Sequence, residues 1–114
     1  MVQPLVRLKK HKEFVSVAEH GRKYVAKGLI LQVLVRPQDN RFNDLIRVGF
    51  TTSRKVGNAV KRNRIRRRLR EVVRLHLPQI AQKGCDYVII GRTRTLMRPF
   101  DELVQDLRDA VASV

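Results

Sequence analysis

Residues 54–74 read RKVGNAVKRNRIRRRLREVVR, and this segment decides the fold. On a helix that turns about 100° per residue, its apolar side chains fall on one stripe. The stripe consists of Ile65, Leu69, Val72 and Val73, and it continues to His76. We therefore predict a helix that is capped by Asn58, runs to about Leu77 and is ended by Pro78. Its apolar stripe should pack against a sheet.

The same segment holds ten of the 25 basic residues of the chain and one acid, Glu71. Basic residues flank the stripe on both sides: Arg62, Arg66, Arg70 and Arg74 on one, and Lys61, Arg64 and Arg68 on the other. Like charges four residues apart cost a few tenths of a kcal/mol per pair, and a merely solvated helix usually mixes signs. The pattern favours a helix that binds a polyanion over a solvated charged face.

The start of this helix adds a second anion-binding feature. Gly57 allows a tight turn, and the free N–H groups after Asn58 can bind phosphate. Arg54 and Lys55 come just before that turn. A phosphate backbone at this end would meet fixed dipoles and mobile cations together.

Apolar, β-branched runs on both sides of the helix predict strands. Residues 29–35 and 45–52 are two such runs, and the polar turn region 37–44 between them favours an antiparallel pair. A third strand, residues 87–90, follows the helix. If the second and third strands run parallel, the helix between them is a βαβ crossover.

Two further helices are expected at the ends of the chain. Residues 1–8 look like a flexible lead-in, Lys9–His20 is a short amphipathic helix closed by Gly21, and residues 22–27 form a charged connector. Near the C-terminus, Pro99 suits the first position of a last helix.

The last helix is predicted from its own apolar face and acids. The face consists of Phe100, Leu103, Leu107, Ala110 and Val111. Asp101 and Glu102 suit the positive helix start, and Glu102, Asp106 and Asp109 are expected on an exposed face. The order α-β-β-α-β-α predicts an α+β fold, a two-layer α/β sandwich forming one domain over residues 1–114.

Charge and size limit the kinds of partner. The chain has 114 residues, one domain's worth, and carries 25 Lys and Arg against 10 Asp and Glu, a net charge of +15. Nucleic acid, an anionic membrane surface and an acidic protein are all possible partners. Nucleic acid is favoured because the basic residues are mostly arginine, whose planar fork matches phosphate and stacks on bases.

Cysteine content and hydropathy suggest a cytoplasmic protein. Cys85 is the one cysteine, which excludes an intrachain disulfide and a multi-cysteine zinc site, and we expect it to be a buried thiol. No stretch approaches the ~20 apolar residues of a membrane span, and the N-terminus lacks the apolar core of a signal peptide. We expect no membrane association.

The run from Gly49 to Glu71 resembles the signature of the bacterial ribonuclease P protein family, and Arg62-Asn63-Arg64 matches its recognition motif. The resemblance extends over nearly the whole chain. Residues 7–21, with Arg7-Leu8-Lys9-Lys10, Glu13-Phe14 and Gly21, are similar to the family's opening helix. Residues 86–92 are similar to a later strand. The central signature is specific, and the flanking matches are weaker.

This resemblance implies a role without protein-borne catalysis. The family pairs with one large catalytic RNA, ribonuclease P RNA, which holds the Mg²⁺ ions and cuts the phosphodiester bond. The protein contacts that RNA through the arginine-rich helix. It also binds the 5′ leader of precursor tRNA in a cleft between sheet and first helix. The resemblance implies a left-handed βαβ crossover, no cofactor on the protein alone and no obligate protein partner.

The residues expected to bind RNA are Phe14, Arg54, Lys55, Asn58, Lys61, Arg62, Asn63, Arg64, Arg66, Arg67, Arg68, Arg70 and Arg92. Phe14 could offer a stacking face in the leader cleft or belong to the core. Ala18 and Gln32 stand where the family often has further aromatics, so the cleft is expected to rely more on charge and hydrogen bonds. Arg92, with Arg94, matches a family position only loosely, and plain surface charge is an equal explanation.

Three other classes of protein fit parts of the pattern. A small ribosomal or general RNA-binding protein would share the charge and size but not the signature. A DNA-binding protein would place its helix in a helix-turn-helix or a dimer. A self-sufficient nuclease would need clustered carboxylates for metal ions, and we assign no catalytic or metal-binding residue.

Overall fold

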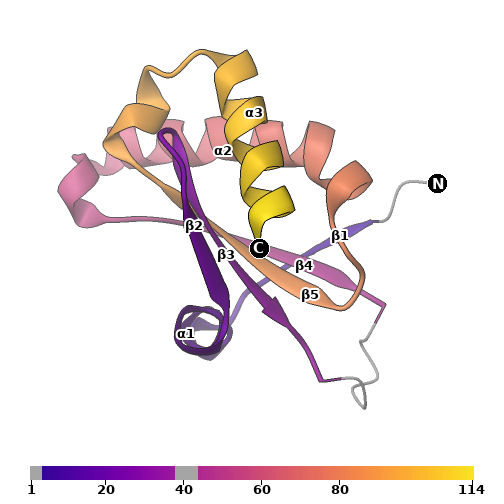
Figure 1. The fold of residues 1–114 in the computed structure, drawn as a ribbon. Helices are drawn as coiled ribbons and strands as arrows, with labels where there is room; N and C mark the ends of the chain where they lie inside the picture. The colour runs from indigo at the N-terminus through magenta and orange to yellow at the C-terminus, as the bar shows by residue number, and fades with distance from the viewer. Residues whose placement is uncertain (1–3, 38–43) are drawn as a thin grey trace.

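The computed structural model describes residues 4–37 and 44–114 (Figure 1). Its strands are β1 (Leu5–Arg7), β2 (Arg22–Val25), β3 (Leu29–Val35), β4 (Ile46–Thr52) and β5 (Cys85–Gly91). Its helices are α1 (His11–His20), α2 (Ala59–Ile80) and α3 (Phe100–Ser113), with 3₁₀ turns η1 (Arg54–Val56) and η2 (Thr93–Leu96). The α+β class is confirmed, and the structure has two strands, β1 and β2, that the sequence did not predict.

The five strands form one sheet in the order β1-β4-β5-β3-β2. β5 runs parallel to β4 and antiparallel to β3, so β4, α2 and β5 make the expected βαβ unit. The expected direct pairing of residues 29–35 with 45–52 is wrong, because β5 lies between them. Six of the seven β5 residues are buried, and a strand so apolar on both faces belongs in the sheet centre.

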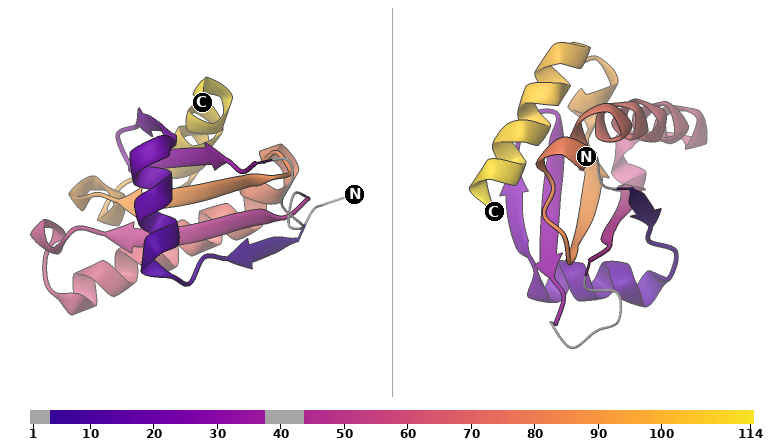
Figure 2. Two further views of the ribbon diagram at one scale, coloured as in Figure 1. Left: turned by 90° about the horizontal axis from the view of Figure 1, so that it is seen from below. Right: turned by 90° about the vertical axis from the view of Figure 1, so that its right-hand side faces the viewer.

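Helices cover both faces of the sheet (Figure 2). On one face, α2 and α3 enclose the main core, to which β5 contributes Tyr87 and Ile89. On the other face, α1 packs over a smaller core of Leu8, Val17 and Val88. The expected sandwich of helices on the sheet is thus present, and α1 adds a partial layer on the opposite face.

The N-terminal segment differs from the expected lead-in. Leu5–Arg7 pairs in parallel with β4, and the Leu8 N–H donates to the Val48 carbonyl at 2.8 Å. Leu8 is buried in the smaller core. Residues 5–8 are therefore ordered parts of the sheet and core. A strand of three residues is too short to show an alternating pattern in the sequence, so β1 was not predicted. Residues 1–3 lie outside the described part.

The expected connector at residues 22–27 is also partly a strand. Arg22–Val25 pairs antiparallel with β3 and forms the second edge of the sheet. Its first two residues, Arg22 and Lys23, are exposed. Charged side chains are typical of edge strands, where they discourage pairing with other molecules, and they concealed this strand in the sequence. The expected turn at 37–44 lies mostly outside the described residues.

Helix ends shift by a few residues. α2 does not stop at Pro78 but continues to Ile80, and the Ala81 N–H closes it on the Leu77 carbonyl at 2.9 Å. A proline this close to the helix end removes one hydrogen bond without ending the last turn. At α1, Lys10 is the N-cap, and at α3, Pro99 is the N-cap rather than the first helical residue.

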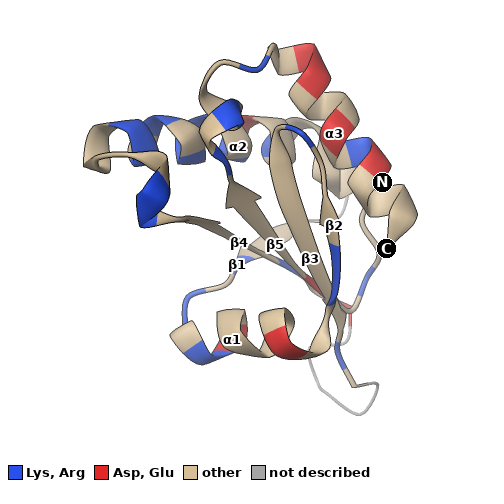
Figure 3. Ribbon diagram, turned by 60° about the vertical axis from the view of Figure 1, so that its left-hand side comes forward, with Lys and Arg blue, Asp and Glu red and all other residues tan. Residues whose placement is uncertain are grey.

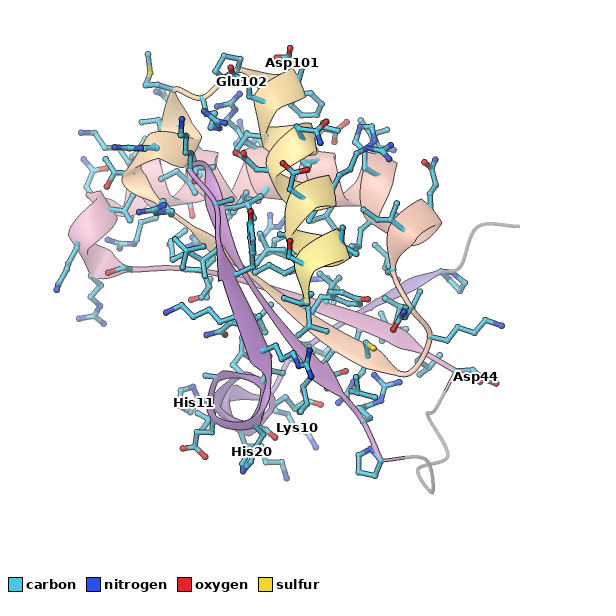
Figure 4. The ribbon with its side chains drawn as sticks, in the orientation of Figure 1. Lys10, His11, His20, Asp44, Asp101 and Glu102 are labelled. Atoms are coloured by element: carbon cyan, nitrogen blue, oxygen red, sulfur yellow. The ribbon has the colours of Figure 1, made fainter. Side chains whose placement is uncertain are left out.

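The last helix buries Leu103, Leu107 and Ala110 as expected. Asp101 and Glu102 stand at its start, where they suit the helix dipole (Figure 4). The helix differs from expectation at two residues: Phe100 is more exposed than predicted, and Asp106 is more buried.

Phe100 is 37% exposed rather than part of the apolar face. Asp106 is buried rather than solvated, because it accepts hydrogen bonds from the Gly28 N–H at 3.0 Å and from Arg98 Nε at 2.5 Å. A buried carboxylate needs such partners, and they come from distant parts of the chain. Cys85 is buried and free, as expected.

Candidate RNA interface

Helix α2 is clamped to the sheet along one side. Its stripe residues Ile65, Leu69, Val72 and Val73 are at most 2% exposed and belong to the main core, as the sequence predicts. The rest of the helix therefore faces outward. Lysines and arginines follow α2 and the turn before it, whereas acids gather on α3 (Figure 3). The molecule is thus polarised, with one strongly basic helix.

Four basic side chains of α2 are exposed and make no hydrogen bond or ion pair with the described residues: Lys61, Arg64, Arg67 and Arg70. Asn63, between them, is exposed as well. Unpaired guanidinium groups keep all five N–H donors for a ligand, and they match phosphate oxygens two at a time. These four residues form the most available cationic surface of the helix.

Two other arginines of α2, Arg62 and Arg66, already make hydrogen bonds within the fold. Arg62 donates from Nη1 to the Gly57 carbonyl at 2.6 Å, and Arg66 donates to Thr52 Oγ1 at 3.1 Å and to the Asn63 side chain. Both side chains are half-buried. These bonds stabilise the turn before α2 and the end of β4, and each guanidinium group retains further N–H donors.

Arg68 is the most structural of the basic residues on α2. Its Nη1 donates to the carbonyls of Thr95 at 2.5 Å and Leu96 at 3.0 Å. These bonds tie α2 to the η2 turn that follows β5. The sequence placed Arg68 in the RNA-binding row, and nothing in its local pattern signalled this long-range contact.

The turn before α2 is built from short local bonds. Ser53 Oγ accepts from the Lys55 N–H at 3.1 Å, and Asn58 Oδ1 accepts from the Lys61 N–H at 3.0 Å. The predicted cap by Asn58 is confirmed. Gly57 has φ of +142°, a conformation that favours glycine, so the predicted turn is also confirmed.

Arg54 and Lys55 lie exposed on this turn, at the positive end of the α2 dipole. Asn58 presents its side-chain oxygen to the helix, so its exposed side-chain NH2 group keeps two donors for a ligand. The turn and the first exposed residues of α2 form one continuous basic surface.

A cleft of about 510 Å³ opens between α1 and the face of the sheet opposite α2. Residues from α1, β3, β4 and β5 line it: Lys9, His11, Phe14, Val15, Ala18, Gln32, Phe50, Thr51, Val88 and Ile90. It holds basic groups at one end and apolar groups along its floor. Ala18 and Gln32 do lie in it, which the sequence comparison with the family anticipated.

Phe14 serves both of the roles left open by the sequence. It lines the cleft, and it also packs against the small core beside Val17 and Val88. Its ring lies directly over Gly49, where an added Cβ would come within 2.5 Å of two ring carbons. Gly49 therefore sets how closely this aromatic approaches the sheet.

A chain of ion pairs fixes the start of α1 to the sheet. Arg47 donates from Nη1 to Glu13 Oε2 at 2.7 Å, and from Nε and Nη2 to the two oxygens of Asp86, both at 2.7 Å. Asp86, whose side chain is 3% exposed, also pairs with Arg36 at 2.6 Å. The hydrogen bonds that Arg47 donates to the Asp86 carboxylate are the largest influence on the pKa of Arg47, and they raise it.

Glu13 completes this network at the helix cap. Its Oε1 accepts from the N–H groups of Lys10 at 2.9 Å and Lys9 at 3.2 Å. Burial alone would raise the pKa of Glu13, but those hydrogen bonds and the charges of Arg47 and Lys10 outweigh it and lower the pKa. The role of Arg47 was not predicted from the sequence. The only local signal for this network is Glu13, which lies three residues after the Lys10 cap.

Arg92 follows β5 directly and is the N-cap of the η2 turn. It is half-buried, and its Nη1 donates to the Ala26 carbonyl at 2.5 Å. Arg94 beside it is exposed. The bond to Ala26 gives Arg92 a structural role next to the predicted RNA contact.

No group of three or more His, Cys, Asp or Glu side chains that could hold a metal ion occurs among residues 4–37 and 44–114. Within the same ranges, no helix is long and apolar enough to cross a membrane. Several of the described acids instead cap helices or pair with arginines. Glu13, Glu71, Asp86 and Asp106 are the clearest cases.

A basic helix on one side of a sheet, and an open cleft on its other face, are typical of nucleic-acid-binding proteins of α+β class. The sequence model of the Ribonuclease P family matches residues 3–114. The ribonuclease P protein component of Paramagnetospirillum magneticum is 51% identical over the whole chain and 86% of its own length. That of Gluconacetobacter diazotrophicus is 52% identical over 90% of this chain and 84% of its own. The chain belongs to the ribonuclease P protein family.

Solved structures show the same fold. The RNase P protein from Thermotoga maritima superposes with a TM-score of 0.77 at 22% identity, covering 95% of this chain and 96% of that one. The Staphylococcus aureus RNase P protein gives a TM-score of 0.74 at 24% identity, covering 94% and 93%. Family membership makes the chain a protein component of ribonuclease P, an endoribonuclease of tRNA processing, and implies partnership with ribonuclease P RNA.

Proposed function

We propose that α2 and the turn before it bind the catalytic ribonuclease P RNA, and that the cleft beside α1 binds the 5′ leader of precursor tRNA. The RNA subunit then cuts the leader and leaves the mature tRNA 5′ end. The observation that carries this proposal is the separation of the two surfaces. α2 covers one face of the sheet, and the cleft opens on the other.

The α2 surface suits a folded RNA. Its exposed cations and the turn at Arg54 and Lys55 offer phosphate contacts without reading a sequence, which is how proteins position themselves on a structured backbone. The half-buried Arg62 and Arg66 are held in place by the fold, so they lose little side-chain entropy on binding.

The cleft suits a single strand of variable sequence. Such a strand needs charge for its phosphates and flat or apolar faces for its bases. Lys9 and His11 supply polar groups at one end, and Phe14, Val88 and Ile90 supply apolar surface. Because Ala18 and Gln32 replace aromatics here, we expect stacking to contribute less than in relatives with more aromatic residues.

In this proposal, Mg²⁺ ions held by the RNA supply the cleavage chemistry. The protein brings the leader close to that RNA and reduces phosphate repulsion between the two RNAs. A higher local cation density lowers the magnesium concentration that assembly needs. The single buried Cys85 fits the cytoplasm that we propose as its compartment.

The direct test is cleavage of precursor tRNA at low magnesium by a bacterial ribonuclease P RNA, with and without this protein. We expect the protein to restore cleavage at the mature 5′ end and to cleave nothing without the RNA. Binding to that RNA no tighter than to an unrelated structured RNA, with no gain in cleavage, would favour a ribosomal or general RNA-binding protein. Cleavage by the protein alone would point to a nuclease.

Phe14→Ala tests the cleft. We expect it to reduce the preference for precursor over mature tRNA about fivefold to tenfold, through lost stacking, while assembly with the RNA stays near normal. Phe100→Ala is the matched control, because Phe100 is a partly exposed phenylalanine outside the cleft. Equal weakening for both tRNAs would make Phe14 a core residue only.

A further inference from the structure

A second groove lies between the edge strand β1 and helix α2, on the sheet face that α2 covers. It encloses about 470 Å³. Leu5 and Val73 form apolar walls, and Arg7, Arg70 and Arg74 contribute the charge. Its lining contains three arginines and no acidic residue. None of the proposed leader contacts of α1 reaches this groove.

Arg7 and Phe50 form a cation–π pair that lines this groove. The guanidinium carbon of Arg7 lies over the Phe50 ring, 5.1 Å from its centroid. The backbone on either side of Arg7 is fixed, because Arg7 is in register with Val48 on β4 and the next N–H, of Leu8, bonds to the Val48 carbonyl. Arg7 is exposed, so its guanidinium group remains accessible to a ligand beside the Phe50 ring.

The cations around this pair are not equally available. Arg70 is exposed and has no hydrogen bond or ion pair with the described residues, whereas Arg74 pairs with Glu71 at 2.6 Å. Arg70 is therefore the group that can bind a phosphate beside the Arg7–Phe50 pair. A planar cation backed by a ring, an adjacent free arginine and apolar walls together match one nucleotide, with its base and its phosphate.

We propose that this groove binds one unpaired nucleotide of RNA, whose base stacks on the outer face of the Arg7 guanidinium and whose phosphate pairs with Arg70. This inference rests on the proposed function, because it assumes that the protein binds RNA. Guanidinium planes stack on unpaired bases, and the Phe50 ring holds the plane in position. A paired base in an A-form helix exposes no such face, so the site selects a single-stranded nucleotide.

Two RNAs could supply that nucleotide. Phe50 lines both this groove and the cleft beside α1, so a leader strand that leaves the cleft could reach it. Arg70 belongs to the α2 surface, so a bulged nucleotide of ribonuclease P RNA could reach it as well. The chemistry is the same in both cases, and binding measurements can separate them.

The deciding variant is Arg7→Lys, which keeps the charge and removes the plane. We expect it to weaken RNA binding roughly fivefold or more, while the slope of log affinity against log salt stays unchanged. Arg22→Lys, at an exposed arginine of the other edge strand, is the matched control and should bind like the unchanged protein. Phe50→Leu keeps an apolar side chain but removes the ring, and should reproduce the loss.

Two titrations assign the source of the nucleotide. A loss in direct binding to ribonuclease P RNA places the nucleotide in the catalytic RNA, and a loss confined to precursor tRNA binding by the holoenzyme places it in the leader. Unchanged affinity of Arg7→Lys in both titrations overturns the proposal. If the unchanged protein itself fails to bind ribonuclease P RNA selectively, the proposed function fails instead. Thermal melting of each variant confirms that it is folded.

Discussion

At the scale of single residues, the basic side chains of α2 divide by what they already bond within the protein. Arg64 and Arg68 lie one helical turn apart on the same flank. Arg64 is exposed without a partner in the described chain, whereas Arg68 donates to the Thr95 and Leu96 carbonyls. Two arginines with equal charge and neighbouring positions therefore differ in role: Arg64 is available to a ligand, and Arg68 stabilises the fold.

Arg64→Ala and Arg68→Ala should separate these roles. Hydrogen bonds from a charged donor contribute about 1.5–3 kcal/mol, so Arg68→Ala should lower the free energy of unfolding by about 2 kcal/mol. Arg64→Ala should change it by less than about 0.5 kcal/mol and weaken RNA binding instead. Urea unfolding and RNA titration of both variants check this. Equal stabilities would show that the bonds of Arg68 contribute nothing to the fold.

At the scale of elements, α1 forms one wall of the cleft, and besides the buried Val17 two attachments hold it to the sheet. The first turn of α1 is attached to the sheet by the ion pairs of Arg47 with Glu13 and Asp86. The Phe14 side chain of the same helix packs on Gly49. The two attachments act at neighbouring residues of the helix. The width of the cleft is therefore set by the Glu13–Arg47 ion pair and by Gly49, which has no side chain to hold α1 farther from β4.

The attachment through Glu13 should weaken in acid. The pKa of Glu13 is lowered in the folded protein, so its contribution to stability is complete above its ordinary value of 4.5 and is lost as the pH falls through the lowered pKa. Glu13→Gln should cost on the order of 1 kcal/mol at neutral pH, and this cost should shrink as the pH falls from 4.5 through the lowered pKa of Glu13.

Glu19→Gln makes the same charge change at an exposed position of the same helix and is the control. Melting temperatures of the three proteins across this pH range measure the effect. A stability difference between Glu13→Gln and the unchanged protein that stays constant with pH would exclude the ionic attachment.

At the scale of the whole molecule, charge of one sign is concentrated on one helix and the turn before it. The net charge is +15, and the acids lie mostly on α3 and in internal ion pairs (Figure 3). A protein polarised in this way binds a polyanion through one side. Release of counterions should then govern how its RNA affinity depends on salt.

Replacing Arg62 and Arg64 together with Ala should weaken assembly with ribonuclease P RNA and flatten the salt dependence. Each lost phosphate contact lowers the slope of log affinity against log salt by about one. Affinities measured over a series of salt concentrations give the slope. Arg22→Ala with Lys23→Ala removes equal charge from the exposed β2 edge and should leave the slope nearly unchanged. An unchanged slope for the α2 pair would reject these two contacts.

The sequence by itself determined the elements whose signals are local. The apolar stripe at Ile65 and Leu69, the Asn58 cap and the Gly57 turn require only neighbouring residues, so α2 and its basic surface were predictable. The run at residues 29–35 was long and β-branched enough to give β3 with both its ends correct.

Only the tertiary structure decided how these elements meet. β1 and β2 become strands because β4 and β3 offer them free edges, and β5 separates β3 from β4 because it is buried on both faces. The partners of Asp106, Arg68 and Arg47 lie 8–78 residues away along the chain. Short strands and paired charges draw their stability from distant neighbours, and local periodicity carries no information about those neighbours.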